Sequence, residues 1–218
     1  MAELIASVII FLLTHTIPAY VPLRENLVRQ LGERPYRIVY GIITLAVLAW
    51  IGFAYANAPY VELWGQPAWT RWVPILTMPV ACLLLIGGVA AINPFSLSFR
   101  KAGFDPNRPG LIGLCRHPVM WSFALWSLAH LAPNGDVASL LMFGLMFGLS
   151  LYGPVALESK KRRTMIADKG RAAWDGLMAC RGKLRGGNGW VAGFIGGGAF
   201  YLLSLWSHEY LIGQSPVP

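Results

Sequence analysis

The stretch CRHPVMWSFALWSLAHLAPNGD, residues 115–136, decides how the chain is organised. It opens beside a basic residue, continues through an apolar segment that holds His130 near its end, and leaves through the turn residues 133–136. An ionisable side chain within an apolar helix is costly, so such a residue marks a functional site by default. The stretch therefore predicts a helix that lies in a membrane and carries a site histidine.

The composition of the whole chain indicates a membrane protein. The 218 residues are 56% hydrophobic and 13% charged, with a mean hydropathy of +0.52, whereas soluble domains carry about 25% charged residues. The net charge of +8 comes without any RNA- or DNA-reading motif, which argues against nucleic acid as a partner. We expect an all-α integral membrane protein with one domain over residues 1–218.

Six segments are predicted to span the membrane, since a span takes about 20 mostly apolar residues. They are residues 3–20, 36–56, 72–92, 118–132, 137–157 and 189–212. The first segment lacks a basic leader and a clear cleavage site, so we interpret it as a retained span and not as a signal peptide.

The basic residues predict the orientation of these spans. Of the 18 lysines and arginines, all but Arg71 fall near the connections after the first, third and fifth segments. The positive-inside rule places such connections in the cytoplasm. Both termini are then expected in the periplasm, which requires an even number of spans, in a multi-pass protein of the bacterial inner membrane.

The segment 158–188 is the one long polar stretch. Apolar residues recur in it at roughly helical spacing, among them Ile166, Trp174 and Leu177. This pattern predicts a basic amphipathic helix on the cytoplasmic surface that binds anionic lipid headgroups. A solvated loop that only sets the topology is the alternative.

Two small-residue pairs allow helices to approach closely. Gly144 and Gly148 share the fifth segment, and Gly193 and Gly197 share the sixth. Such spacing is typical of tight helix contacts in membranes, within a chain or between copies, although small residues are common there in any case.

The chain holds four histidines, and neutral imidazole is a good ligand for iron or copper. His15, His130 and His208 lie in or near apolar segments, and His117 begins one beside Arg116. Two imidazoles from different helices suit a non-covalent haem, whereas an interhelical hydrogen bond is the alternative for any single histidine. His117 and His130 would lie about 20 Å apart along one helix, so they do not ligate one iron together.

Several motifs together resemble the NnrU family of bacterial membrane proteins. They are LLTH at residues 12–15, RHP at 116–118, WSLAH at 126–130 and NGD at 134–136. The resemblance covers nearly the whole chain, including the basic segment. That family is associated with denitrification and nitric oxide metabolism, and it is similar to the plant zeta-carotene isomerase, which uses b-type haem for cis–trans isomerisation of a polyene.

The resemblance implies a b-type haem whose iron is held by His15 and His130. Ser127 stands where the isomerase has a cysteine, so this chain lacks the thiolate alternative to His130, and the isomerase activity does not carry over directly. The predicted cofactor-binding residues are His15, His130, Ser127, Arg116 and His117. By the predicted boundaries His15 and His130 differ in depth by roughly 13 Å, so pairs of His15 with His117 and of His130 with His208 stay open.

A second, more distant similarity concerns isoprenylcysteine carboxyl methyltransferases. It rests on Arg116–Pro118 entering a helix and on Glu158 and Trp174 in the basic segment, regions that hold S-adenosylmethionine in that family. Met120 replaces its usual tyrosine, and one acid replaces a pair. Three functions are therefore open. They are a haem protein with a redox, nitric oxide-related or isomerase role that acts on a ligand or substrate from the lipid, a methyltransferase, and a non-catalytic membrane factor.

Overall fold

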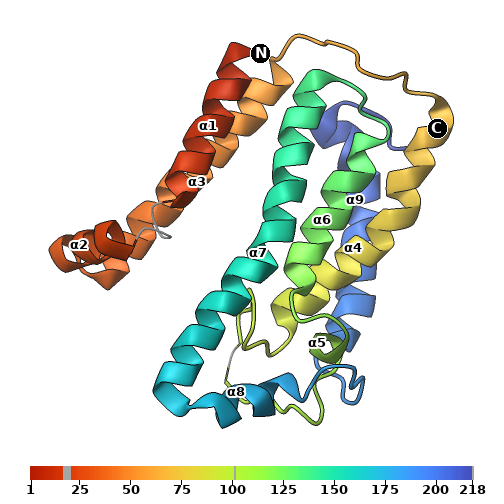
Figure 1. Cartoon of the computed structure of the whole chain (residues 1–218). Helices are drawn as coiled ribbons and strands as arrows, with labels where there is room; N and C mark the ends of the chain where they lie inside the picture. The colour runs from red at the N-terminus through yellow and green to blue at the C-terminus, as the bar shows by residue number, and fades with distance from the viewer. Residues whose placement is uncertain (17–20, 101, 218) are drawn as a thin grey trace. The chain divides into compact units, whose positions relative to one another are not determined.

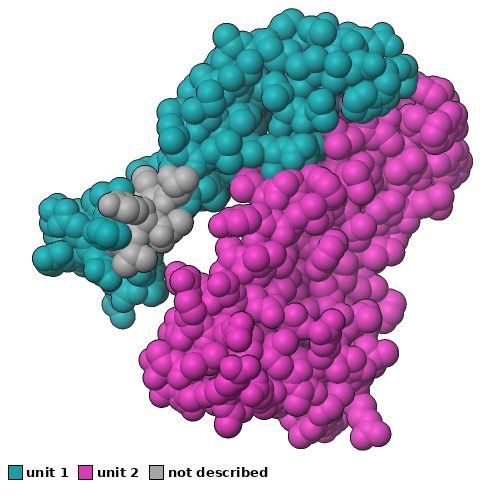
Figure 2. All heavy atoms as spheres, viewed as in Figure 1, with its two compact units in different colours: residues 1–65, 135–145 teal, residues 66–134, 146–218 magenta. Residues whose placement is uncertain are grey.

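The computed structural model describes residues 1–16, 21–100 and 102–217 (Figure 1). In that part of the chain every regular element is a helix, and paired extended backbone amounts to two isolated bridges. The contacts divide the chain into unit 1, Met1–Gly65 with Gly135–Leu145, and unit 2, Gln66–Asn134 with Met146–Pro218 (Figure 2). The predicted all-α class is confirmed.

Unit 1 is built on two helices, α1 (Ala2–Thr16) and α3 (Glu33–Ala56), which pack side by side (Figure 1). Leu4 of α1 and Ile51 of α3 are buried in this contact layer, with 0% and 1% of their surface exposed. The unit also takes in the first turns of α7 (Val137–Lys169). Apolar residues facing each other along two helices explain this pairing.

A short helix, α2 (Val21–Leu31), precedes α3 and was not predicted. Its charged and apolar residues alternate over too few positions to give a hydropathy signal. Gly32 separates the two helices, because its φ of 82° is one that glycine adopts readily. The predicted first span begins as α1, and its last residues, 17–20, lie outside the described residues.

Helix α4 (Trp72–Ala90) is the centre of unit 2. It packs against α6 (Pro118–Leu131) on one side and against η2 (Ala192–Gly196) and α9 (Gly197–Ile212) on another. The hydroxyl of Ser122 in α6 donates to a carbonyl of α4 at 2.7 Å. The remaining elements of unit 2 are η1 (Ala68–Arg71), α5 (Leu111–Leu114), the later part of α7 and α8 (Arg171–Met178).

Glycines let η2 and α9 approach α4 closely. A Cβ on Gly193 would lie 3.0 Å from a backbone oxygen of α4, and one on Gly197 would lie 2.8 Å from another. The close helix contact predicted for this pair is confirmed within the chain. Gly144 and Gly148 show no such contact, since a Cβ on Gly148 would meet no described atom within 4 Å.

Helix α7 continues beyond the predicted end at Leu157 and reaches Lys169. No helix-breaking residue intervenes, and Gly170, with a φ of 80°, is the first position at which the helix ends readily. The amphipathic surface helix predicted within residues 158–188 is therefore wrong in extent. The first part of that segment continues α7, and only α8 is separate.

The apolar face of α8 packs on protein. Trp174 is 6% exposed and belongs to a buried cluster with Ala91, Phe95, Ile112 and Cys180. The Phe95 and Trp174 rings meet edge to face at 6.2 Å. At Trp174 the apolar face is thus covered by the loop after α4, whereas the predicted binding of anionic lipid headgroups by this segment stays a prediction.

Within residues 1–16, 21–100 and 102–217, three elements are long and apolar enough to cross a membrane. They are α3, α7 and the continuous stretch Ala68–Ala90, while Ala2–His15 is apolar but shorter. The chain thus has helices suited to a membrane, as predicted. The layout of six spans with both termini in the periplasm stays a prediction.

Candidate functional site

A cleft of about 830 Å³ lies in unit 2 where α6 begins. Arg116 and His117 line it from the loop before α6, and Trp121 lines it from the first turn of that helix. The lining from α7 consists of Pro154, Val155, Glu158, Ser159, Arg162, Arg163, Ile166 and Ala167. The cleft therefore joins the predicted Arg116–His117 pair to residues 154–167 in the later part of α7.

The carboxylate of Glu158 holds this pair together. Nη2 of Arg116 donates to Oε2 at 3.0 Å and to Oε1 at 3.2 Å, and Nε of Arg116 lies 3.3 Å from Oε2. Nε2 of His117 also lies 3.3 Å from Oε2. One carboxylate thus accepts from a guanidinium and an imidazole, which fixes the direction of both side chains.

Local sequence explains why Arg116 and His117 sit here. His117 is the residue before α6, and Pro118 occupies the first turn, where its missing N–H is not needed. Nδ2 of Asn93 donates to the carbonyl of Arg116 at 3.0 Å. Gly88 of α4 makes room for the proline, because a Cβ there would lie 2.6 Å from the Pro118 ring.

Burial controls the charge of His117, whose surface is 4% exposed. Burial lowers its pKa below the usual value, the Glu158 hydrogen bond and charge oppose this, and the Arg116 charge adds to the lowering. A neutral imidazole that donates from Nε2 to Glu158 carries its lone pair on Nδ1. Among the described residues that Nδ1 atom is buried without a hydrogen-bond partner.

His15 and His130 share one arrangement, in which each ring contacts the residue four positions earlier in its own helix. Nδ1 of His15 lies 2.9 Å from the carbonyl oxygen of Phe11, and Nδ1 of His130 lies 2.7 Å from that of Trp126. Each ring also packs on the aromatic side chain of the same residue. His15 belongs to unit 1 and His130 to unit 2, so their pairing stays a prediction.

Four of the predicted site residues lie on α6 or directly before it, and they fall into two groups along the helix. His130 lies in the last turn of α6, so it is at the opposite end from His117, as the spacing predicted. Ser127 is fully buried, and its hydroxyl lies 2.6 Å from the carbonyl of Phe123 in its own helix. Only Arg116 and His117 share the cleft, and neither Ser127 nor His130 lines it.

The residues on which the similarity to methyltransferases was based do not all lie together. Glu158 does join Arg116 and His117, although Trp174 lies in the separate cluster beneath α8 and does not line the cleft. Sequence reasoning missed Arg162 and Arg163 as lining residues because they read as part of a charge run. It also missed Asn93, whose only signal is a polar residue in an otherwise apolar stretch.

No group of three or more histidine, cysteine or acidic side chains that could hold a metal ion occurs within residues 1–16, 21–100 and 102–217. A haem iron needs only one or two protein ligands, so the absence of such a group among these residues does not bear on haem binding.

Residues 3–216 match the family model described as NnrU protein, which covers nearly the whole chain. Neither a curated protein nor a solved structure matches the chain.

Proposed function

Because the chain belongs to the NnrU family, we propose that it is a haem-binding membrane protein of denitrification or nitric oxide metabolism. In this proposal His15 and His130 are the iron ligands of a b-type haem. The observation that carries it is the shared geometry of these two imidazoles, since each places Nδ1 against a carbonyl oxygen four residues earlier.

That geometry suits a haem ligand. An Nδ1–H that donates to a carbonyl fixes the tautomer, orients the ring and leaves the lone pair on Nε2, which is how metal-binding histidines are commonly supported. His15 and His130 are both partly buried on apolar helices. When bound, the haem would supply an iron centre that takes a small ligand or an electron.

The absorbance spectrum of the purified full-length protein, produced with ample haem, tests this proposal. We expect a Soret band that His15→Ala and His130→Ala each weaken or shift, whereas His208→Ala and His117→Ala leave it unchanged. If the band depends instead on His117 or His208, one of the alternative histidine pairs holds the iron. A folded but colourless protein would overturn haem binding and favour a non-catalytic membrane factor.

The denitrification role has its own test. Deleting the gene from a denitrifying bacterium should change the rate at which nitric oxide is consumed under low oxygen, and the wild-type gene should restore the rate. The double variant His15→Ala, His130→Ala should fail to restore it although it reaches the membrane. Unchanged nitric oxide turnover in the deletion strain would contradict the role.

We further propose six membrane spans in the bacterial inner membrane, with both termini in the periplasm. Large apolar side chains point outward on the helices that are too short to count by length alone. In α9, for example, Leu202, Trp206 and Leu211 are 64%, 70% and 77% exposed. A lipid environment accounts for such a surface, because a soluble monomer rarely exposes so much contiguous apolar area.

A further inference from the structure

The cleft at the start of α6 has two chemically different halves. Trp121 and Val155 form an apolar half, and Arg162 and Arg163 form a basic half further along α7. Residues 155 and 162 are seven positions apart, which corresponds to about 10 Å along the helix axis. Along α7 the lining of the cleft is therefore apolar at residues 154–155, charged at residues 158, 162 and 163, and apolar again at residues 166–167.

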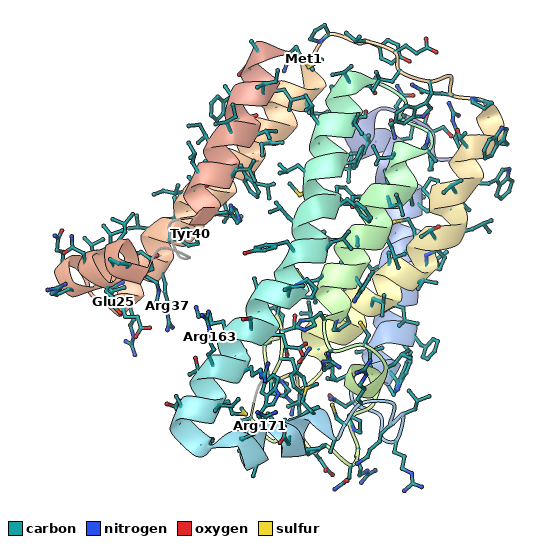
Figure 3. All side chains as sticks on the ribbon, viewed as in Figure 1. Met1, Glu25, Arg37, Tyr40, Arg163 and Arg171 are labelled. Atoms are coloured by element: carbon teal, nitrogen blue, oxygen red, sulfur yellow. The ribbon has the colours of Figure 1, made fainter. Side chains whose placement is uncertain are left out.

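In the described part of the chain, no carboxylate is paired with the two arginines of the cationic half. Glu158 compensates the charge of Arg116, with which it shares three close contacts. Arg162 and Arg163 are both exposed, and within the described residues no carboxylate oxygen lies within 4.0 Å of either guanidinium. Figure 3 shows the Arg163 side chain extending outward from α7. Two guanidinium groups on one rim form a site for an anion.

The apolar half is uncovered. Trp121 is 46% exposed and Val155 is 66% exposed, so two large apolar side chains lie open beside the charged rim. Tryptophan at such a boundary is typical of the level at which lipid headgroups meet acyl chains. A soluble anion would use only the arginines and would leave this apolar surface in water.

We propose that this cleft binds one anionic phospholipid. Its phosphate lies at Arg162 and Arg163, whose planar guanidinium groups match phosphate oxygens, and an acyl chain covers Trp121 and Val155. The positive charge of the rim favours an anionic lipid over a net-neutral one, and the apolar wall disfavours a free phosphate. Neither His15 nor His130 lines the cleft, so the lipid proposal does not depend on haem binding.

Native mass spectrometry of the full-length protein, released from nanodiscs of phosphatidylcholine and phosphatidylglycerol, tests the basic half. We expect one tightly held phosphatidylglycerol. Because each basic residue near an anionic lipid contributes about a factor of five, Arg162→Gln with Arg163→Gln should weaken retention by about thirtyfold. Lys160→Gln with Lys169→Gln removes the same charge from the same helix outside the cleft and should change retention less than about twofold. Equal losses in both double variants would overturn a defined site.

The apolar half is tested with Trp121→Ala and a soluble probe. We expect Trp121→Ala to weaken phosphatidylglycerol retention severalfold while circular dichroism shows an unchanged helix content. In calorimetry, glycerol phosphate should bind far more weakly than the lipid. Any heat released by S-adenosylmethionine should be the same in the wild type and in the variant that lacks Arg162 and Arg163. Tight binding of either soluble compound at these arginines would overturn the lipid proposal.

Discussion

Glu158 is the residue on which the polar contacts of the cleft converge. Its carboxylate is 27% exposed at the side chain and serves both Arg116 and His117. Without it, a guanidinium that is only 21% exposed would lose its partner while it stays largely out of water. A partner lost from a half-buried pair costs more than one lost from an exposed pair, because the remaining charge is poorly solvated.

The substitution Glu158→Gln should therefore destabilise the folded protein by about 2 kcal/mol, which is less than the roughly 3–5 kcal/mol lost from a fully buried pair. Thermal unfolding in detergent, followed by circular dichroism, measures this. The control is Glu33→Gln, which breaks the exposed pair with Arg37 within α3 and should cost at most about 0.5 kcal/mol. Equal effects of the two substitutions would show that Glu158 has no special structural role.

His117 predicts a pH dependence of stability. Burial lowers its pKa in the folded protein, whereas an unfolded histidine titrates near about 6.5. The unfolded state therefore binds the proton more readily, so the neutral imidazole stabilises the fold above that pH. This contribution is lost as the pH falls through the lowered pKa.

We expect the unfolding midpoint to fall between pH 8 and pH 5, and to fall less in His117→Gln than in the wild type. Glutamine keeps a neutral donor for Glu158 but does not titrate, so the difference between the two proteins isolates the imidazole. Midpoints that fall equally in both proteins would contradict this assignment.

For single residues, the sequence predicted where a side chain lies along a helix better than it predicted which other side chain it contacts. Arg116 and His117 could be placed at the start of a helix because Pro118 marks its first turn. Glu158 was singled out only through a distant family similarity, since its contact with Arg116 joins residues 42 positions apart. Hydropathy and periodicity carry no information about such a pair.

Some parts of the helices could likewise be predicted from the sequence, and others could not. The core of α3 and of α4 could be predicted because long apolar runs leave no other solution in a membrane. The end of α7 could not, since charged residues can continue a helix as readily as they form a loop. Trp174 was assigned to lipid because an amphipathic face does not reveal whether lipid or the protein's own loop covers it.

Gly197 makes the contact between α9 and α4 testable. A Cβ at this position would lie 2.8 Å from both a carbonyl oxygen and the Leu83 Cα of α4, and backbone atoms cannot move aside locally. We expect Gly197→Ala to lower stability by about 1–3 kcal/mol through overpacking.

The neighbouring Gly198 is a matched control, because a Cβ there meets no described atom within 4 Å. Gly198→Ala should leave stability unchanged or raise it by up to about 1 kcal/mol, since alanine favours a helix over glycine. Thermal unfolding of both variants in the same detergent decides the matter, and a tolerated Gly197→Ala would argue against close packing of the two helices.

For the whole molecule, the sequence predicts more membrane spans than the lengths of the helices alone establish. In the part of the chain that the structure describes, three elements qualify as spans by length and apolar character. The apolar segments of the sequence predict six spans, and the placement of basic residues requires an even number. The shorter helices α1, α6 and α9 decide between these counts. Their exposed apolar surface favours crossing, because water would have to solvate it otherwise.

Accessibility of single cysteines in intact cells tests this layout. In a background with Cys82, Cys115 and Cys180 replaced by alanine, a membrane-impermeant maleimide should label Gly65→Cys and Gln214→Cys, which we expect in the periplasm. It should reach Ala102→Cys and Leu184→Cys only after the cells are opened. Neutralising Lys160–Arg163 should then make Leu184→Cys partly accessible in intact cells, because four of the charges that hold this connection inside are gone. Labelling of Ala102→Cys in intact cells would contradict the six-span layout, and an unchanged pattern in the neutralised variant would show that the other basic residues suffice to set the orientation.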